Sequence, residues 1–309
     1  MNINLSNIKK AVKYLNKNEC IGIPTETVYG LAANAYSDKA TDKIFKLKKR
    51  PRKNPLIVHY YNLKDLKNDC KIDNQFLRLY SKFCPGPITF VLELKEKSKI
   101  SNNVTNNKST IAVRFPKHKV ARKLLKNLNF PLAAPSANIS KSISAVCKTD
   151  VIEEFGNKIK FVLDGGKSKE GLESTIVNLV GNQKILRLGS LDRGKIEKYL
   201  IKKRTNKKKD IVMPGQGRIH YSPGLPIRLN IKRPKKFEAF LLISKRIKSN
   251  KNFFYLSKNK NLKEVAKNLY KTLRKIKKKG FKQISIEKIP NRGIGEAIND
   301  RLLRAAVKK

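Results

Sequence analysis

The sequence predicts an α/β fold, with a mixed sheet in a large first domain and a smaller α/β unit behind it. Short apolar runs of strand length alternate with helix-length runs through the first two thirds of the chain. A charged stretch at 202–210 and a Gly- and Pro-rich stretch at 213–226 interrupt this alternation, which then begins again. We therefore expect a first domain at 1–202, a linker at 203–226 and a second domain at 227–309.

The elements of the first domain follow from its apolar periodicity. Segment 1–18 is expected to form an amphipathic helix with Ile8, Val12 and Leu15 on one side. Further helices are expected at 38–49, 74–83, 120–128, 150–155 and 192–201. Strands are expected at 20–24, 55–60, 88–94, 110–115, 132–134, 160–163, 175–179 and 185–188.

The second alternation is shorter. It predicts strands at 237–244, 253–256 and 281–286, and helices at 262–278 and 295–307. A unit of this length is close to the minimum for an independent hydrophobic core.

The chain carries 71 Lys and Arg against 23 Asp and Glu, a net charge of +48. Such a charge favours a polyanionic partner such as ATP or tRNA. It is also what a Lys-, Asn- and Ile-rich proteome would produce, and the lysines are spread along the whole chain. We attribute most of the charge to composition, and expect salt-dependent, nonspecific binding of nucleic acid in either case.

The four cysteines, Cys20, Cys70, Cys84 and Cys147, are scattered and form no Cys-x-x-Cys pair. We therefore expect neither a zinc site nor a disulfide framework, and a reducing compartment. No segment has the apolar core of a signal peptide or the roughly 20 apolar residues of a membrane span. These features predict a cytoplasmic protein without a membrane partner and without a metal held by the protein.

Two near-matches to phosphate-binding motifs are rejected. Segment 189–195 has the spacing of a P-loop, but Ile196 replaces the Ser or Thr that would hold magnesium. Gly293 and Gly295 lack the third glycine of a dinucleotide fingerprint, because Ile298 stands in its place. Use of ATP by this chain would need a different loop.

Four polar segments, each at the end of a predicted strand, remain as candidates. At 24–31, clustered hydroxyls and Gly30 suit a small polar ligand, although an ordinary turn would explain them alone. At 48–56, Pro51 and Pro55 restrain a loop that presents several cations, which suits a triphosphate. Favourable placement of those cations at the end of a helix dipole is an equal alternative.

The other two segments have the same character. At 133–138, small residues would let a ligand approach the backbone beside Ser136 and Asn138, although a turn closed by its own side chain is the alternative. Segments 164–166 and 173–176 again combine a strand end with exposed hydroxyls. Each of the four patterns is weak when it is taken alone.

In their order along the chain, these segments resemble one family. The matching motifs are PTETVYGL, KxRPxxNPLIVH, CPGPITFVL, TIAVRFP, AAPSAN, DGG and ESTIVN, beginning at residues 24, 48, 84, 110, 133, 164 and 173. They resemble the threonylcarbamoyl-adenylate synthases of the YrdC-domain family through most of the first domain. Residues 214–224 and 291–302 resemble the linker and the end of the C-terminal domain in the longer members.

This resemblance implies an α/β (α+β) fold: a YrdC-like twisted mixed sheet with flanking helices around a basic concave cleft, and a small Rossmann-like C-terminal domain. It also implies a reaction that joins L-threonine, bicarbonate and ATP into threonylcarbamoyl-AMP and releases pyrophosphate. A separate transferase complex would then pass the group to adenosine in tRNA. ATP is implied as a substrate accompanied by Mg²⁺, without a tightly bound cofactor. Such chemistry depends on positioning and charge neutralisation, without a protein nucleophile.

The resemblance also implies site residues. Lys48 and Arg50 are expected to be catalytic, to meet the phosphates and to be exposed in a cleft, and Arg114 to pair with the threonine carboxylate. The implied L-threonine site comprises Thr27, His59, Arg114, Ala134 and Ser174. The implied ATP site comprises Lys48, Arg50, Asn54, Thr110, Ser136, Asn138, Ser144, Arg187, His220 and Tyr221, of which the last two belong to a linker that would close over the site.

Two other functions compete with this one. A noncatalytic protein that grips double-stranded RNA or tRNA would explain the charge, but the sequence has no aromatic-rich RNA-binding signature. Carbamoyl transfer during metalloenzyme maturation is the other alternative, but the sequence lacks the zinc-finger and acylphosphatase-like parts expected for it.

Overall fold

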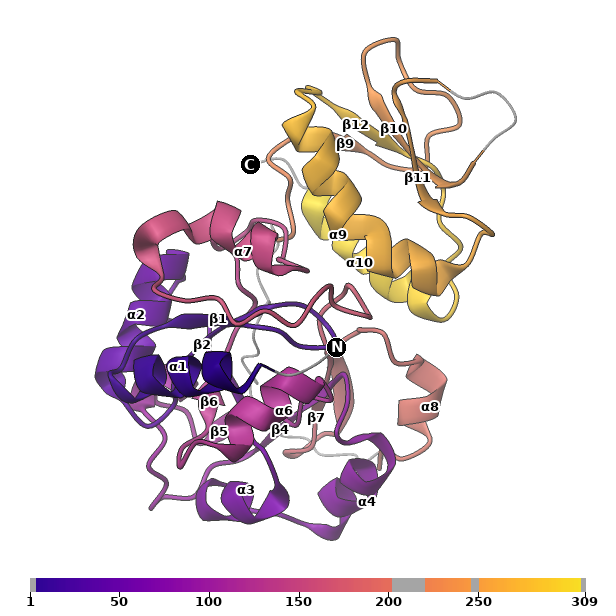
Figure 1. Cartoon of the computed structure of the whole chain (residues 1–309). Helices are drawn as coiled ribbons and strands as arrows, with labels where there is room; N and C mark the ends of the chain where they lie inside the picture. The colour runs from indigo at the N-terminus through magenta and orange to yellow at the C-terminus, as the bar shows by residue number, and fades with distance from the viewer. Residues whose placement is uncertain (1–3, 202–219, 246–249, 307–309) are drawn as a thin grey trace.

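The computed structural model describes residues 4–201, 220–245 and 250–306. Figure 1 shows a larger body, built from the chain up to residue 201, and a smaller one built from the chain after residue 226. Helices pack on sheets in both bodies. The predicted α/β fold is confirmed.

The larger body is built on an eight-stranded mixed sheet. Its strands are β1 (Ile21–Ile23), β2 (Gly30–Asn34), β3 (Ile57–His59), β4 (Ile88–Glu93), β5 (Thr110–Arg114), β6 (Leu132–Ala133), β7 (Thr175–Asn178) and β8 (Lys184–Arg187). They are ordered β1-β2-β6-β3-β5-β4-β7-β8. The pairs β3–β5 and β4–β7 are parallel, and the other neighbours are antiparallel.

Every helix of this body except α7 (Lys148–Phe155) begins after a residue whose side chain caps its first turn. They are α1 (Leu5–Asn16), α2 (Asp38–Lys48), α3 (Leu63–Asp69), α4 (Asn74–Phe83), α5 (Asn102–Thr105), α6 (Lys119–Lys126), α7 (Lys148–Phe155) and α8 (Arg193–Glu197). Ser37 accepts a hydrogen bond from Ala40 N at the start of α2, and Asp73 accepts one from Phe76 N at the start of α4. These bonds satisfy backbone donors that the first helical turn leaves unpaired.

Alternation along the central strands separates the core from the face that carries polar side chains. In β5, Ile111 and Val113 belong to the main hydrophobic core. Ala112 belongs instead to a small apolar cluster on the other face, which it forms with Ile57, Val91 and Ile176. Because side chains alternate along a strand, Arg114 lies on the same face as Ala112.

The smaller body has a four-stranded parallel sheet. Its strands β9 (Ile227–Arg228), β10 (Ala239–Ser244), β11 (Phe253–Ser257) and β12 (Ile284–Ile286) are ordered β11-β10-β12-β9. Its helices are α9 (Leu262–Lys278) and α10 (Ile294–Ala306), and Figure 1 shows them between this sheet and the larger body. The parallel sheet agrees with the predicted Rossmann-like unit.

Most predicted elements are present, and α4 and α9 have the predicted bounds. The strand predicted at 160–163 is wrong, because Val162 makes a single bridge to Gly22 before the chain turns away at 164–166. The helix predicted at 192–201 is shortened to α8. The apolar pattern of the sequence does not predict β2, α3, α5, β9 or a 3₁₀ turn at Gly156–Lys158.

Residues 203–219 of the predicted linker lie outside the described residues. The domain boundaries at 202 and 227 therefore remain a prediction. Among the described helices, none is both long and apolar enough to cross a membrane.

Candidate functional site

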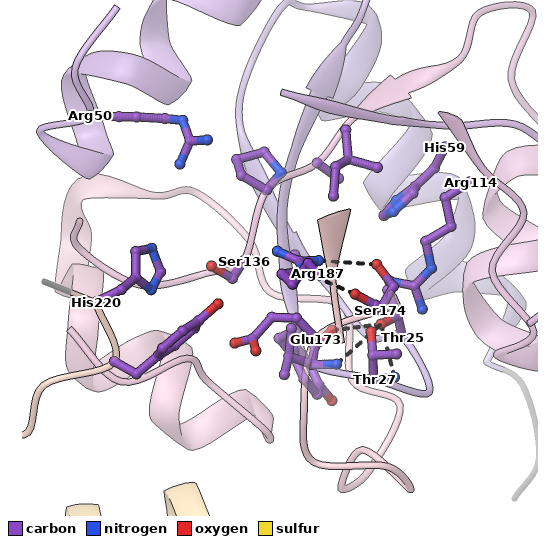
Figure 2. Close-up of a pocket in the computed structure, with 17 residues that line it drawn as sticks. Thr25, Thr27, Arg50, His59, Arg114, Ser136, Glu173, Ser174, Arg187 and His220 are labelled. Atoms are coloured by element: carbon purple, nitrogen blue, oxygen red, sulfur yellow. Dashed lines mark hydrogen bonds between the residues drawn. The ribbon is translucent and has the colours of Figure 1, made fainter. Parts of the chain in front are cut away.

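A pocket opens on the sheet face that carries Arg114. Figure 2 shows His59, Arg114, Thr25, Thr27 and Ser174 toward one end of it, and Arg50 and His220 toward the other. Its seventeen lining residues are Thr25, Thr27, Val28, Tyr29, Gly30, Arg50, Ile57, His59, Arg114, Ala134, Pro135, Ser136, Glu173, Ser174, Arg187, His220 and Tyr221.

Two neighbouring nitrogen-bearing side chains form one wall of the pocket. His59 and Arg114 are register partners on β3 and β5. Burial and the adjacent charge of Arg114 hold the pKa of His59 well below its ordinary value, so the imidazole is neutral. Nδ1 of His59 and Nε of Arg114 have no hydrogen-bond partner in the described structure. Because buried polar groups are normally hydrogen-bonded, these two atoms are available to an anionic ligand.

Hydroxyl groups stand beside these two nitrogens. The hydroxyls of Thr25 and Thr27 are 2.8 Å apart, and those of Thr89 and Ser174 are 2.7 Å apart. Arg187 donates through Nε to the carbonyl of Ser174 at 3.0 Å and through Nη2 to its hydroxyl at 3.2 Å. This end of the pocket therefore suits a small ligand with carboxylate, amine and hydroxyl groups.

The opposite end is positively charged. Arg50 follows the last turn of α2, where it donates to the carbonyls of Asn54 and Pro55 at 2.9 and 2.8 Å. Burial, together with the charge of Arg187, lowers the pKa of Arg50 to about 9. Arg187 is thus a second cation near Arg50, and two neighbouring guanidinium groups favour a polyanionic ligand between them.

His220 and Tyr221 line the same charged end, from the chain that leads to the smaller body. Burial lowers the pKa of His220 to about 3, so its imidazole is neutral. The ring of Tyr221 stacks on Tyr270 of α9 with centroids 6.0 Å apart, and the guanidinium of Arg301 lies 5.0 Å from its centroid. The smaller body thereby holds this wall of the pocket in place.

Glu173 joins the two bodies beneath the pocket. Its carboxylate accepts hydrogen bonds from Ser144 at 2.5 Å, from the hydroxyl of Tyr270 at 3.1 Å and from Nε of Arg301 at 2.9 Å. Burial acts to raise the pKa of Glu173, but Arg301 and Arg187 bring it down to about 2. The carboxylate therefore stays ionised and engaged by protein donors.

These residues do not suit a metal ion held by the protein itself. Glu173 is the single carboxylate among the described lining residues, and its oxygens already accept from three side chains. The described residues also contain no group of three or more His, Cys, Asp and Glu that could hold a metal. A divalent cation here would arrive with a phosphate ligand as part of the substrate.

Family models cover almost the whole chain. A family described as "Telomere recombination" matches residues 13–189. A second model, described as the C-terminal domain of threonylcarbamoyl-AMP synthase, matches residues 184–307.

Some named relatives match this chain over nearly its full length. The threonylcarbamoyl-AMP synthase of Pyrococcus abyssi is 34% identical over 97% of this chain and 94% of its own. The chain belongs to the threonylcarbamoyl-AMP synthase family. The Bacillus subtilis synthase is 30% identical over 97% of this chain and 92% of its own. A crystal structure of Sua5 from P. abyssi complexed with L-threonine matches with a TM-score of 0.89 and 32% identity, covering 99% of this chain and 96% of that one.

Membership of the threonylcarbamoyl-AMP synthase family confirms the predicted enzyme class, a nucleotidyltransferase-type enzyme that uses ATP. It also favours the catalytic function over the noncatalytic RNA-binding alternative, because relatives named for the activity match nearly the full length. The described geometry agrees, since the pocket is built for small polar and anionic groups.

The structure brings ten of the predicted site residues together in the pocket. They are Thr27, Arg50, His59, Arg114, Ala134, Ser136, Ser174, Arg187, His220 and Tyr221. The proposed roles of these residues toward threonine and ATP remain predictions.

Lys48 does not lie in the pocket, and the expectation that it is exposed in a cleft is wrong. The residue is 1% exposed, and its ammonium donates to the carbonyls of Ser136 and Asn138 at 2.6 and 2.5 Å. It falls on the buried face of α2 because it follows the buried Ile44 by four residues. Burial lowers the pKa of Lys48 well below its ordinary value. Lys48 therefore holds the loop that carries Ser136.

The four other predicted residues do not line the pocket. Thr110 begins β5, four residues before Arg114 and on the same face. The carbonyl of Asn54 accepts from Arg50, and Ser144 donates to Glu173. The amide of Asn138 donates to the carbonyls of Ile139 and Ser142, which fixes the turn after Ser136.

Two carboxylates and one phenol at or next to the pocket are not among the residues predicted from the sequence. Glu26 and Glu173 lie inside the motifs that begin at residues 24 and 173, directly beside Thr27 and Ser174, and the rarity of acidic residues in this chain is a usable signal. Tyr29 lines the pocket, donates to the carbonyl of Gly166 at 2.8 Å and accepts from Gly165 N at 3.0 Å. It gave no signal beyond its position in the motif.

Proposed function

We propose that this pocket joins L-threonine, bicarbonate and ATP into threonylcarbamoyl-AMP and releases pyrophosphate. The observation that carries the proposal is the separation of two chemical environments in one pocket. Arg114, His59 and several hydroxyls form one end, Arg50 lies at the other, and Arg187 lies between them. An amino acid and a nucleotide triphosphate need these two environments side by side.

The amino-acid end would take L-threonine. Nε of Arg114 and Nδ1 of His59 would hold its carboxylate, since both lack a partner. Thr27 and Ser174 offer hydroxyls for the polar groups of the substrate, and Ala134 keeps the wall small enough for its methyl group.

The charged end would take the phosphates of ATP. Arg50 and Arg187 would neutralise them, with Ser136 and His220 as hydrogen-bond donors and Tyr221 closing that wall. ATP would enter as its magnesium complex, which is the substrate. Lys48, Asn54, Thr110, Asn138 and Ser144 would act by shaping the loops around it.

The chemistry requires two bond-forming steps. The threonine ammonium gives up one proton, and the free amine forms a C–N bond to the carbon of bicarbonate. The bicarbonate hydroxyl leaves with a second nitrogen proton as water, which gives a carbamate that keeps one N–H. A carbamate oxygen then attacks the α-phosphorus of ATP, the bond to the β-phosphate oxygen breaks, and pyrophosphate leaves with the electron pair. The residues hold both reactants in line and neutralise charge, so no protein nucleophile is required.

The remaining assignments concern the setting of the reaction. We propose that residues 1–202 form the catalytic domain, with 203–226 as a linker closing the site and 227–309 as a supporting domain. The product would serve N6-threonylcarbamoyladenosine formation in tRNA through a separate transferase complex, in the cytoplasm. Direct contact with tRNA is not required by this proposal.

Pyrophosphate release by the purified protein tests the proposal. Release should require ATP, L-threonine and bicarbonate together, and mass spectrometry should detect threonylcarbamoyl-AMP. Release that is indifferent to threonine, from protein shown to be folded by circular dichroism, would overturn it.

A further inference from the structure

Glu26 lies directly behind the amino-acid end of the pocket without lining it. It sits in the segment that joins β1 to β2, and its side chain is 7% exposed. Its Oε1 accepts a hydrogen bond from Nη2 of Arg114 at 2.6 Å, and the Arg114 side chain is 5% exposed. The two side chains form a buried, charge-assisted pair.

The second oxygen of Glu26 is fixed by backbone. Oε2 accepts hydrogen bonds from Lys117 N at 3.0 Å and from His118 N at 3.3 Å. These two amides follow β5, the strand that ends at Arg114. Glu26 therefore ties the end of β5 and the guanidinium of Arg114 to the same carboxylate.

This arrangement leaves one defined part of the guanidinium for a ligand. Glu26 engages Nη2, whereas Nε of Arg114 has no partner in the described structure and belongs to a residue that lines the pocket. An arginine presents its donors in a rigid planar fork, so fixing one edge also fixes the direction of the others.

We infer that Glu26 is a positioning residue for Arg114, which it holds in the orientation that receives the carboxylate of the amino-acid substrate. The inference rests on the proposed function, in which Arg114 binds that carboxylate. It adds a residue that the resemblance to the family did not assign. Glu26 is not a catalytic residue, because the described structure places it behind the lining residues, where its oxygens already accept from Arg114 and two backbone amides.

Substitution Glu26→Gln tests the inference with little change of shape. The amide oxygen can still accept from Lys117 N and His118 N, but the NH₂ group then faces Arg114 as a donor against a donor. We expect L-threonine, titrated calorimetrically into the folded variant, to bind at least about tenfold more weakly because Arg114 is no longer preorganised. Binding of ATP should stay within about twofold, and the rate at saturating threonine should fall much less than the affinity.

Asp69→Asn provides a matched control. Asp69 is a buried carboxylate of the same body that accepts hydrogen bonds from Tyr36, Tyr60 and Ser98 at 3.0, 2.9 and 2.7 Å, away from the pocket. Its substitution should lower thermal stability without changing threonine affinity. Glu26→Asp keeps the charge, and should therefore weaken threonine binding less than Glu26→Gln does.

Two outcomes would overturn the inference. Unchanged or tighter threonine binding by folded Glu26→Gln would show that Glu26 only competes for Arg114. If Glu26→Gln does not fold, Glu26→Asp decides, because wild-type affinity in that variant excludes dependence on the orientation of the pair. Arg114→Ala distinguishes failure of the proposed substrate site from failure of the role of Glu26. If Arg114→Ala also binds threonine normally, the proposed substrate site is wrong. If Arg114→Ala loses threonine binding and the Glu26 variants do not, only the role of Glu26 is wrong.

Discussion

Nε of Arg301 on α10 lies 2.9 Å from Oε2 of Glu173, a lining residue of the pocket that belongs to the other body. The two side chains are 0% and 7% exposed. Nη2 of Arg301 also donates to the carbonyl of Leu188 at 2.6 Å, next to Arg187. A single guanidinium from the smaller body thus fixes two segments of the pocket wall.

Substitution Arg301→Ala should therefore damage both stability and synthesis. Removing one partner of a buried ion pair costs about 3–5 kcal/mol, because the other charge is left buried. Urea unfolding followed by fluorescence or circular dichroism would measure this loss.

The matched control is Arg304→Ala. Arg304 lies on the same helix and pairs with the same Asp300, but its side chain is 26% exposed. Pairs of that kind contribute less than about 1 kcal/mol. Equal destabilisation in the two variants would contradict the role assigned to Arg301.

The acid stability of the protein should depend on Glu173. Its pKa in the folded protein is about 2 against an ordinary value of 4.5, since Arg301 and Arg187 outweigh burial. A depressed pKa gives stability that is complete above the unfolded value and disappears as the pH falls through the folded value. We expect the loss of roughly 3 kcal/mol between about pH 5 and pH 2. The unfolding free energy of Glu173→Gln, measured over the same range, should fall less steeply, and an identical slope would exclude Glu173 as the source.

Lys48 and Arg50 should respond differently to alanine substitution, although they are two residues apart. Lys48→Ala leaves the carbonyls of Ser136 and Asn138 without their buried donor. We therefore expect the unfolding free energy to fall by roughly 2–4 kcal/mol and the synthetic activity to be lost as well. Arg50→Ala removes a half-buried side chain that lines the pocket. Synthesis should therefore be lost, while the unfolding free energy falls by only about 1 kcal/mol. Thermal melts and pyrophosphate release would be measured on the same samples.

Lys46→Ala is the control for both variants. Its side chain is 75% exposed on the same helix and pairs with Asp42. Neither melting temperature nor synthesis should change. If Lys48→Ala is as stable as Lys46→Ala, the result would favour the prediction from the sequence that Lys48 is an exposed phosphate ligand.

The outline of the fold was predictable because, in the long elements, the hydrophobic period and the helix-capping residues favour the same structure as the tertiary packing. The amphipathic pattern of α9 and the Asp73 cap of α4 define those helices locally. β2 was missed because its sequence, GLAAN, consists largely of small residues with little strand propensity. It forms a strand through pairing with β1 and β6, which a local pattern cannot show.

The sequence predicted which residues make up the site better than it predicted how they are arranged. Motif position placed Arg50 and Lys48 together, but it could not show that one helical face buries Lys48 while Arg50 lies beyond the end of α2. Glu173 was overlooked because its partners, Tyr270 and Arg301, are contributed by a distant part of the chain. Long-range contacts of that kind leave no spacing signal in the sequence.

Gly189 offers a test of how tightly the pocket wall is packed. A Cβ added there would lie 2.3 Å from Thr175 N and 2.6 Å from the carbonyl oxygen of Glu173. Because backbone atoms cannot move aside as a flexible side chain does, Gly189→Ala should displace the segment that carries Glu173 and Ser174. We expect a loss of about 1–3 kcal/mol in unfolding free energy and a larger loss of synthesis.

Gly194, five residues further on, should tolerate the same change. An added Cβ would meet only Asp192 Oδ1, at 3.4 Å, and the residue lies in α8, where alanine is preferred to glycine by up to about 1 kcal/mol. Gly189 and Gly194 are the two glycines of the rejected P-loop spacing, so the pair also tests that rejection. Loss of activity with both substitutions would favour a phosphate loop at 189–195, whereas loss with Gly189→Ala alone assigns Gly189 to close packing beneath the substrate pocket.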